Sequence, residues 1–496
     1  MRLQPIAAAL LSASLFTACG GGGGGGSSDD DNNSTTSLIN IENVLKVLET
    51  NADIALAVYT DAITTAEALK TALTALRADP TETTLQSAKD AWLAAREPYG
   101  QTEVYRFRLS PIDSTNYSDE NGPEGDINAW PLGEALIDYV NVDTGNSADD
   151  FGDDQVGVTA NAAGINGNGA LTEADAETDS SNNIIGNTSI TINADLLANT
   201  ATADDEHDVI AGYHAIEFLL WGQDLNNNAT ITVPEDRTQA VKTHDASNLA
   251  TGGQRPISDF VSTASNDAAD RRHQYLEVAV DKLIADLQQV RDGWIEGASY
   301  RTAFTSVANE AEAKQKLAEI LTGMGTLSEG ELAGERMQIA FSTNSQEDEH
   351  SCFSDNTHRD IWLNAEGVSN SYYGVYAGYD SDLDGIDDET TNAVDGYGID
   401  DYLQDAGLTT LKSNIETALT DTESAYVAID AAARAGRPVD VLITEEKTSD
   451  NPLYPAIISL NSQSSLIQQI ADELNLGNVV DDDASGCDTS DPSAEC

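Results

Sequence analysis

The residues in this chain best suited to chemistry are His214 and Glu217, which lie three positions apart inside the apolar run from Ala211 to Gly222. In a helix, residues with this spacing lie on the same face. An imidazole and a carboxylate that project together from a buried helix are one way in which proteins build a metal site. The alternative is a histidine–carboxylate hydrogen bond within a core. The spacing alone leaves both interpretations open.

A second group of polar residues occupies a short stretch in the C-terminal half. Glu347 and His350 form the reverse pair, Glu-x-x-His, and Asp355 and His358 follow closely. The chain contains six histidines, and three of them belong to these two groups. This concentration favours metal chemistry.

Three further residues could complete or support such a site. Glu103 and Arg106 are three positions apart, so that they could share a helix face, and Asp113 follows them. Glu103 could serve as a third metal ligand or as a general base, with Arg106 and Asp113 in supporting positions. The alternative for all three is an ion-pair network that stabilises a domain interface.

These residues lie in long stretches that resemble the imelysin-like family. The run from Ala211 to Gly222 is similar to its Gly-x-His-x-x-Glu signature, and the stretch from Ala95 to Phe107 resembles another of its N-terminal blocks. Gly334 to Met337 and Ser345 to Asp360 resemble its C-terminal half, so the resemblance extends from about residue 40 to about residue 475. The resemblance implies either a metal-dependent peptidase or a protein linked to iron uptake.

The sequence does not complete a known metallopeptidase motif. Such helices carry His-Glu-x-x-His or His-x-x-Glu-His, whereas Phe218 follows Glu217 here. A peptidase would therefore need another ligand and a base from elsewhere, with Glu217 and Glu103 as its catalytic residues. A site made of His214, Glu217 and Glu103 suits iron as well as zinc, and binding requires no base. We therefore favour a metal-linked binding protein with partners in iron uptake, and we retain the metallopeptidase as the alternative.

One acidic stretch has the spacing of a calcium loop. Asp380, Asp382 and Asp384 alternate before a glycine, and Asp388 follows. This pattern resembles calcium-binding loops, but Thr391 stands where an EF-hand carries its twelfth-position glutamate. The stretch is thus either a looser calcium loop or a simple acidic turn.

The charge of the chain excludes some partners. It has 24 basic and 85 acidic residues and a formal net charge of −61. Nucleic acid and anionic lipid surfaces both attract basic proteins, so neither is expected to bind this one. A salt-adapted source explains such a surface, which also attracts cations in general.

The N-terminus predicts export and lipid anchoring. The apolar run from Ile6 to Phe16 is too short to span a bilayer and fits a signal peptide over residues 1–18. Phe16-Thr-Ala-Cys19 resembles the lipobox of bacterial lipoproteins, in which the cysteine is lipidated. Residues 19–37 then form a Gly/Ser/Asp tether. We expect an outer-membrane lipoprotein that faces the periplasm or the cell surface, with an ordinary secretory signal as the alternative.

The fold expected for the rest is all-α, because apolar residues recur at helical spacing and strand patterns are nearly absent. We expect two packed helical bundles, residues 38–295 and 296–475, with the Gly-x-His-x-x-Glu helix near their interface, and an acidic tail over residues 476–496. Two long acidic loops are expected as insertions, at residues 143–181 and 378–401. The helices with the clearest pattern begin near Ile41 or cover Leu85–Glu97, Arg271–Trp294, Glu310–Phe341, Leu408–Ala435 and Ala456–Leu474.

Local signals add detail to these helices and to the cysteines. Asp79 and Pro80 predict an N-cap and a first helical residue. Gly323 and Gly325 predict an interruption of the helix that starts at Glu310. Of the other cysteines, Cys487 and Cys496 could pair in an exported protein, and Cys352 is expected to be buried.

Overall fold

The structure is a computed structural model, and it describes residues 37–128, 130, 132–138, 159–160, 171–172, 183–198, 209–222, 252–253, 255–263, 267–344, 348–480, 485–494 and 496. The predicted signal peptide, Cys19 and Glu347 lie outside these ranges, as does most of the insertion at residues 143–181. Residues Leu38–Cys496 form one unit. The predicted boundary at residue 295 within this unit stays a prediction.

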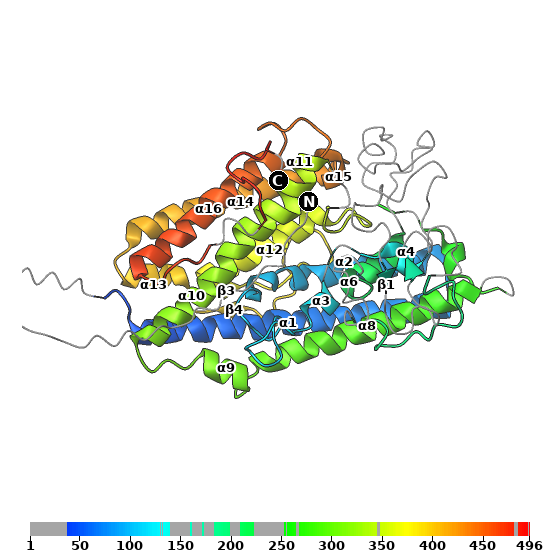
Figure 1. The fold of residues 1–496 in the computed structure, drawn as a ribbon, viewed down its shortest axis with the longest axis horizontal. Coiled ribbons are helices and arrows are strands. Elements are labelled where there is room, and N and C mark those ends of the chain that lie inside the picture. The colour runs from blue at the N-terminus through cyan, green and yellow to red at the C-terminus, as the bar shows by residue number, and fades with distance from the viewer. Residues whose placement is uncertain are drawn as a thin grey trace, which may run out of the picture. The chain divides into compact units, whose positions relative to one another are not determined.

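The N-terminal half is organised by α1 (Ile41–Ala78), the longest described helix (Figure 1). Asn40 begins it, because its side-chain oxygen accepts hydrogen bonds from the amides of Glu42 and Asn43. Its valine, leucine and alanine side chains are buried along most of its length. Both α2 (Glu82–Gly100) and α8 (Asp267–Trp294) pack along it.

The start of α2 differs from the prediction. Thr81, not Asp79, is the N-cap, and its hydroxyl accepts a hydrogen bond from the amide of Thr84 at 3.2 Å. In return the Thr84 hydroxyl accepts from the amide of Thr81 at 3.0 Å. This reciprocal capping box satisfies two amides at once, so the helix begins after Pro80 and not at it.

The C-terminal half contains the other long helices, namely α10 (Glu310–Thr326), η5 (Leu327–Ile339), α12 (Thr357–Tyr373), α14 (Thr409–Arg434) and α16 (Leu453–Leu474), and the short α11 (Ala340–Thr343) that follows η5. α16 packs against α14, α10 and η5. α12 packs against α14 on one side and against α2 on another, so it joins the two halves (Figure 1).

The glycines near residue 324 do not interrupt their helix, contrary to the prediction. α10, η5 and α11 follow one another without a break. A Cβ at Gly323 would lie 2.4 Å from the carbonyl oxygen of Val104, and one at Gly325 would lie 2.7 Å from that of Val479. The glycines therefore permit close packing. After them the helix continues as η5, a π-helix of 13 residues. π-Helices are rare, and those that occur are often found at functional sites.

Short elements complete the described chain. They are η1 (Glu103–Tyr105), α3 (Glu124–Ile127), α4 (Glu134–Ile137), α6 (Gly212–Trp221), η4 (Ile257–Phe260), α9 (Ser299–Phe304), α13 (Ile399–Asp405) and α15 (Val439–Leu442). Two antiparallel pairs of two-residue strands join β1 (Thr159–Ala160) to β2 (Leu171–Thr172) and β3 (Val375–Tyr376) to β4 (Val394–Asp395), with Thr159 opposite Thr172 and Val375 opposite Asp395. The fold is all-α, as predicted.

Two other features bear on the predictions. Cys487 and Cys496 form a disulfide, a pairing that the sequence left open, and Cys352 is buried, as expected. Within the described ranges, none of the helices is both long enough and apolar enough to cross a bilayer.

Candidate functional site

The helix that carries His214 and Glu217 is buried along its whole length. All ten residues of α6 are buried, and the helix packs against α2 and α8. Gly212 begins it with a φ of +78°, and a Cβ there would lie 2.3 Å from the carbonyl oxygen of Ile127. The first glycine of the Gly-x-His-x-x-Glu motif is thus required both by its backbone angle and by this close approach.

His214 and Glu217 contact each other directly. The distance from Nδ1 of His214 to Oε2 of Glu217 is 2.9 Å. The other oxygen of Glu217 accepts hydrogen bonds from the amide of Ser354 at 2.9 Å and from its hydroxyl at 2.6 Å. Both carboxylate oxygens are therefore engaged. The Nε2 atom of His214 is buried and has no hydrogen-bond partner among the residues that the structure describes.

His350 repeats this arrangement beside His214. Its Nδ1 lies 3.0 Å from Oδ2 of Asp360, whose other oxygen accepts a hydrogen bond from Nε of Arg96 at 3.0 Å. The ring centroids of His214 and His350 are 4.8 Å apart, and the rings meet edge to face. The Nε2 atom of His350 lies 3.5 Å from the side-chain nitrogen of Asn128. Two imidazoles thus lie together, each with Nδ1 directed at a carboxylate.

Burial keeps both imidazoles neutral. It lowers the pKa of His214 well below its usual value, and the neighbouring His350 and Arg96 lower it further. Burial and the charge of Arg336 likewise lower the pKa of His350. Neutral imidazole is the form that binds metal ions, through whichever ring nitrogen carries the lone pair.

The two carboxyl groups differ in their ionisation. Burial opposes the ionisation of Asp360, but Arg96 and His350 outweigh it and hold the pKa of Asp360 well below its usual range. His350 therefore carries its proton on Nδ1 and its lone pair on Nε2. Burial raises the pKa of Glu217 to about 8, so its proton position sets the tautomer of His214. When Glu217 ionises, His214 adopts the same tautomer as His350.

Glu103 is held by arginines next to this pair. Its Oε2 accepts hydrogen bonds from Arg106 at 3.0 Å and from Arg336 at 3.1 Å, and its Oε1 lies 3.4 Å from the Asn128 nitrogen. Burial opposes its ionisation, but the charges of Arg106 and Arg336 lower the pKa of Glu103 to about 2. Through Asn128 this ion-pair network reaches His350.

A cavity of about 200 Å³ opens beside His350. Four carboxyl groups and two guanidinium groups line it. Burial and the neighbouring Glu331 raise the pKa of one of the four, Glu335, to about 7. The ring of Trp130, which also lines it, lies 5.0 Å from the ring of His214. The complete lining is Arg106, Glu124, Asn128, Trp130, Glu331, Glu335, Arg336, Asp348 and His350.

The other predicted residues do not join this site. Asp113 accepts hydrogen bonds from the amides of Arg108 and Ser110 and holds a local turn. Asp355 and His358 line a different cavity of about 260 Å³. Of the group predicted around residue 350, only His350 lies beside His214, and Glu347 is outside the described residues.

Several residues of the site were not identified from the sequence. All of them stand within stretches that carry the family resemblance, which was the signal available for them. For Asn128 that stretch is Ile127 to Leu132. The five are Arg96, Arg336 and Asp360, followed by Asn128 and Ser354.

The predicted calcium loop brings three carboxylates together. Ligand atoms of Asp380, Asp382 and Asp384 lie within 4.8 Å of one another, and this is the only such set of three within the described part of the chain. Asp388 is not in the set and instead accepts a hydrogen bond from the amide of Ser381 at 3.0 Å. Glu103 does not form such a set with His214 and Glu217. Calcium binding at the loop stays a prediction.

Comparison with known proteins gives a family and a protein of similar fold. The model of the Imelysin family, which is labelled a peptidase family, matches residues 55–474. The fold is similar to the crystal structure of a protein described as an iron-regulated protein A precursor from Parabacteroides distasonis, with a TM-score of 0.51 and 16% sequence identity. That similarity covers 89% of this chain and 97% of the other. No curated protein sequence matches this one.

Proposed function

Because the chain belongs to the imelysin family, whose model matches residues 55–474, we propose that it binds a metal cation as cargo, with iron favoured over zinc. The observation that carries the proposal is the pair of adjacent neutral imidazoles. In both His214 and His350 a carboxyl group engages Nδ1. The Nε2 atom of His214 takes a ligand when Glu217 is ionised, and that of His350 takes one in place of the Asn128 nitrogen, which lies 3.5 Å away. A carboxylate behind a ligating imidazole is the usual way of fixing its tautomer and raising its basicity.

In this proposal His214 and His350 are the ligands, and Glu217 and Asp360 orient them. This assigns Glu217 a different role from the direct ligation predicted from the sequence, because Ser354 and His214 already engage both of its oxygens. Further oxygen ligands would come from the carboxylates that line the adjoining cavity. Mixed imidazole and carboxylate ligation suits iron.

Two observations favour binding over peptide hydrolysis. A catalytic metal site needs a base that can reach a bound water. Glu217 is fully buried with both oxygens engaged. Glu103 is a poor base, since two arginines lower its pKa to about 2. Neither predicted catalytic carboxylate is therefore placed to act as one.

The biological setting is part of the same proposal. The structural relative is described as iron-regulated, which supports iron as the cation without assigning it to this chain. We place the protein outside the cytoplasm, anchored to the outer membrane through Cys19 and working with partner proteins of iron uptake. The acidic composition supports attraction of cations to its surface.

The test compares cation stoichiometry in matched variants. Each protein carries Asn at positions 380, 382 and 384, in place of the three aspartates, so that the acidic loop does not contribute. Ferrous iron and zinc are titrated in separate calorimetric experiments under anaerobic conditions. We expect one equivalent in the parent and in the His358→Ala control, which removes an imidazole outside the site. The His214→Ala/His350→Ala protein should bind none, and unchanged binding there would refute the proposal.

A further inference from the structure

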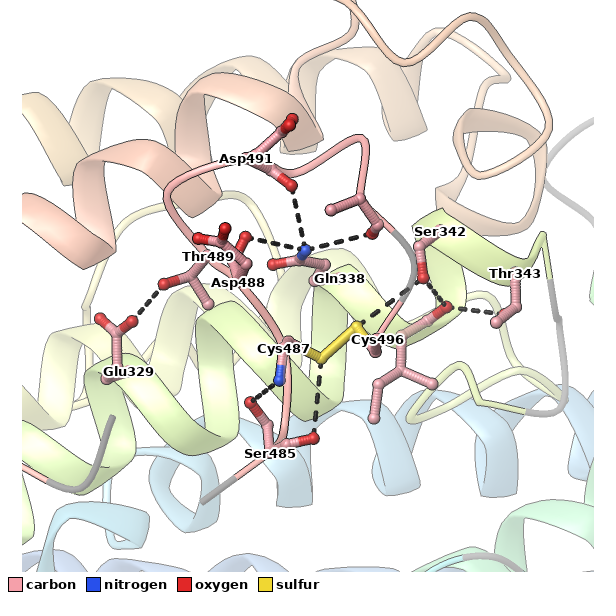
Figure 2. Close-up of a disulfide and its surroundings, with 12 residues drawn as sticks. Glu329, Gln338, Ser342, Thr343, Ser485, Cys487, Asp488, Thr489, Asp491 and Cys496 are labelled. Atoms are coloured by element: carbon pink, nitrogen blue, oxygen red, sulfur yellow. Dashed lines mark hydrogen bonds between the residues drawn. A yellow bond between two sulfur atoms is a disulfide. The ribbon is translucent and has the colours of Figure 1, made fainter. Parts of the chain in front are cut away.

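The C-terminal segment, residues 485–494 and Cys496, lies along the π-helix η5 (Figure 2). A different set of η5 residues, Glu331, Glu335 and Arg336, lines the cavity beside His350. The same helix therefore contacts the chain terminus through some side chains and forms the cavity wall through others.

One glutamine accounts for much of the contact with the terminus. The side-chain nitrogen of Gln338 donates to the carbonyl oxygens of Asp488 at 3.1 Å, Asp491 at 3.2 Å and Ala494 at 3.4 Å. Gln338 is fully buried. Three backbone carbonyls thus converge on the side-chain amide of Gln338. Figure 2 shows this residue and its surroundings.

A buried glutamate makes a second connection. Glu329 accepts hydrogen bonds from the hydroxyl of Thr489, from the hydroxyl of Ser464 at 2.5 Å and from the side-chain nitrogen of Asn461 at 3.1 Å. It therefore ties η5 to α16 and to the terminus. Close packing supports this, because a Cβ at Gly334 would lie 2.2 Å from the hydroxyl oxygen of Ser485.

The disulfide closes the segment that makes these contacts. The partners of Gln338 and Glu329 in the terminus are Asp488, Thr489, Asp491 and Ala494, and all of them lie between Cys487 and Cys496. Closing a chain segment into a ring reduces the conformations that it must give up when it is ordered. The ring consequently presents its carbonyls to Gln338 already gathered.

The position of η5 also determines where charged side chains lie around the site. Arg336 lies two residues before Gln338, and its guanidinium contacts Glu103 at 3.1 Å and Glu331 at 3.0 Å. A π-helix is a rare helical form that rarely extends over several turns, so it depends on tertiary contacts to keep its register. A return of η5 to α-helical register would rotate Arg336 and Glu331 relative to Glu103.

We propose that the Cys487–Cys496 ring is a positioning device that holds η5 in π-helical register and so sets the cavity wall beside His350. Reduction by a dithiol opens the ring: the disulfide takes up two electrons and two protons and becomes two thiols, while the dithiol becomes a disulfide. Opening loosens η5 and weakens cation binding. The last consequence rests on the proposed function, whereas the effect on η5 does not.

Amide hydrogen exchange tests the effect on η5. The Cys487→Ser/Cys496→Ser protein opens the ring, and Gln338→Met removes the convergent donor while the disulfide remains. Ser493→Ala is the matched control, because Ser493 is exposed and, among the residues that the structure describes, its hydrogen-bond partner is Asp491 in the same terminus. Exchange at residues 327–339 should become at least about tenfold faster in both test proteins and stay unchanged in the control and in α1. Unchanged exchange at residues 327–339, or an equal increase in every helix, would overturn the proposal.

Zinc affinity tests the effect on the site in the same proteins. Zinc is used because its binding involves no redox chemistry. The ring-opened and Gln338→Met proteins should bind zinc about tenfold more weakly, and Ser493→Ala should bind it normally. Faster exchange in η5 with unaltered zinc affinity would show that the ring does not position the cavity. If the wild type binds no zinc or iron, the proposed function fails, and the exchange experiment still decides the role of the ring.

Discussion

The imidazole rings of His214 and His350 meet edge to face with their centroids 4.8 Å apart, although one belongs to α6 and the other to the loop before α12. Each directs Nδ1 at a buried carboxylate. The motif that the sequence displays is therefore half of a paired arrangement. The second half comes from the C-terminal part of the chain.

Glu217→Gln should weaken cation binding without unfolding the protein. The carboxyl group of Glu217 can release its proton when a cation binds, whereas the amide of glutamine always donates to Nδ1 of His214 and holds the imidazole proton on Nε2, where it blocks the lone pair. Loss of such an orienting carboxylate lowers metal affinity about 10- to 100-fold. Thermal unfolding should not be impaired, since burial already keeps the pKa of Glu217 at about 8. Calorimetric titration and a melting curve check the two expectations, and an affinity equal to that of the wild type would contradict the orienting role.

Asp360→Asn should be strongly destabilising. It leaves Arg96 charged and buried, with its guanidinium against the rings of Tyr213, Tyr99 and Trp92 but without its carboxylate. Removing one partner of a buried ion pair costs about 3–5 kcal/mol. Glu445→Gln is the control, because its pair with Arg437 is about one-third exposed or more and such pairs contribute at most about 1 kcal/mol. Urea unfolding measures both, and equal losses would show that the Arg96 pair contributes no more than a surface pair.

Glu103→Gln should change the pH dependence of stability in acid. Glu103 has a folded-state pKa of about 2 against an ordinary value of 4.5, because Arg106 and Arg336 stabilise its charge. A lowered pKa contributes stability that is complete above about pH 4.5 and is lost as the pH falls toward 2. The free energy of unfolding of the wild type should therefore exceed that of the variant, and this difference should shrink by about 3 kcal/mol as the pH falls over this range. Urea unfolding at several pH values gives the difference, and a difference independent of pH would contradict the assignment.

The long helices were predictable from the sequence because each buries a periodic apolar face. The spacing over Arg271–Trp294 and Leu408–Ala435 gave α8 and α14 to within a few residues. The boundaries that failed depend on local geometry. Thr81 replaces Asp79 as a cap because it bonds reciprocally with Thr84, and Gly323 packs against a carbonyl instead of ending a helix.

The candidate site was predictable only in part. The spacing of His214 and Glu217 placed them on one face of a helix, and they do contact each other. It could not show that Ser354 engages the second oxygen of Glu217, nor that Asp360 holds His350, because both contacts arise from tertiary packing. Likewise, no pattern in the sequence distinguished the π-helical η5 from an α-helix.

Cys19→Ser should release the protein from membranes. Cys19 lies outside the described residues, so this prediction rests on the resemblance of Phe16-Thr-Ala-Cys19 to a lipobox. Without the cysteine no lipid can be attached, and the acidic chain has no attraction to anionic lipid. Fractionation of cells into membrane and soluble material gives the answer. The Ser27→Ala protein is the control, and a variant at Cys19 that fractionates like it would contradict lipid anchoring.

The most direct test of the cation site is anomalous diffraction at the iron absorption edge from crystals of the protein grown with ferrous iron. We predict a single strong peak within bonding distance of Nε2 of both His214 and His350, with Glu217 and Asp360 still hydrogen-bonded to the two Nδ1 atoms. A peak found only at the Asp380–Asp384 loop, or an iron bound directly by Glu217 with His350 turned away, would contradict the paired-imidazole site.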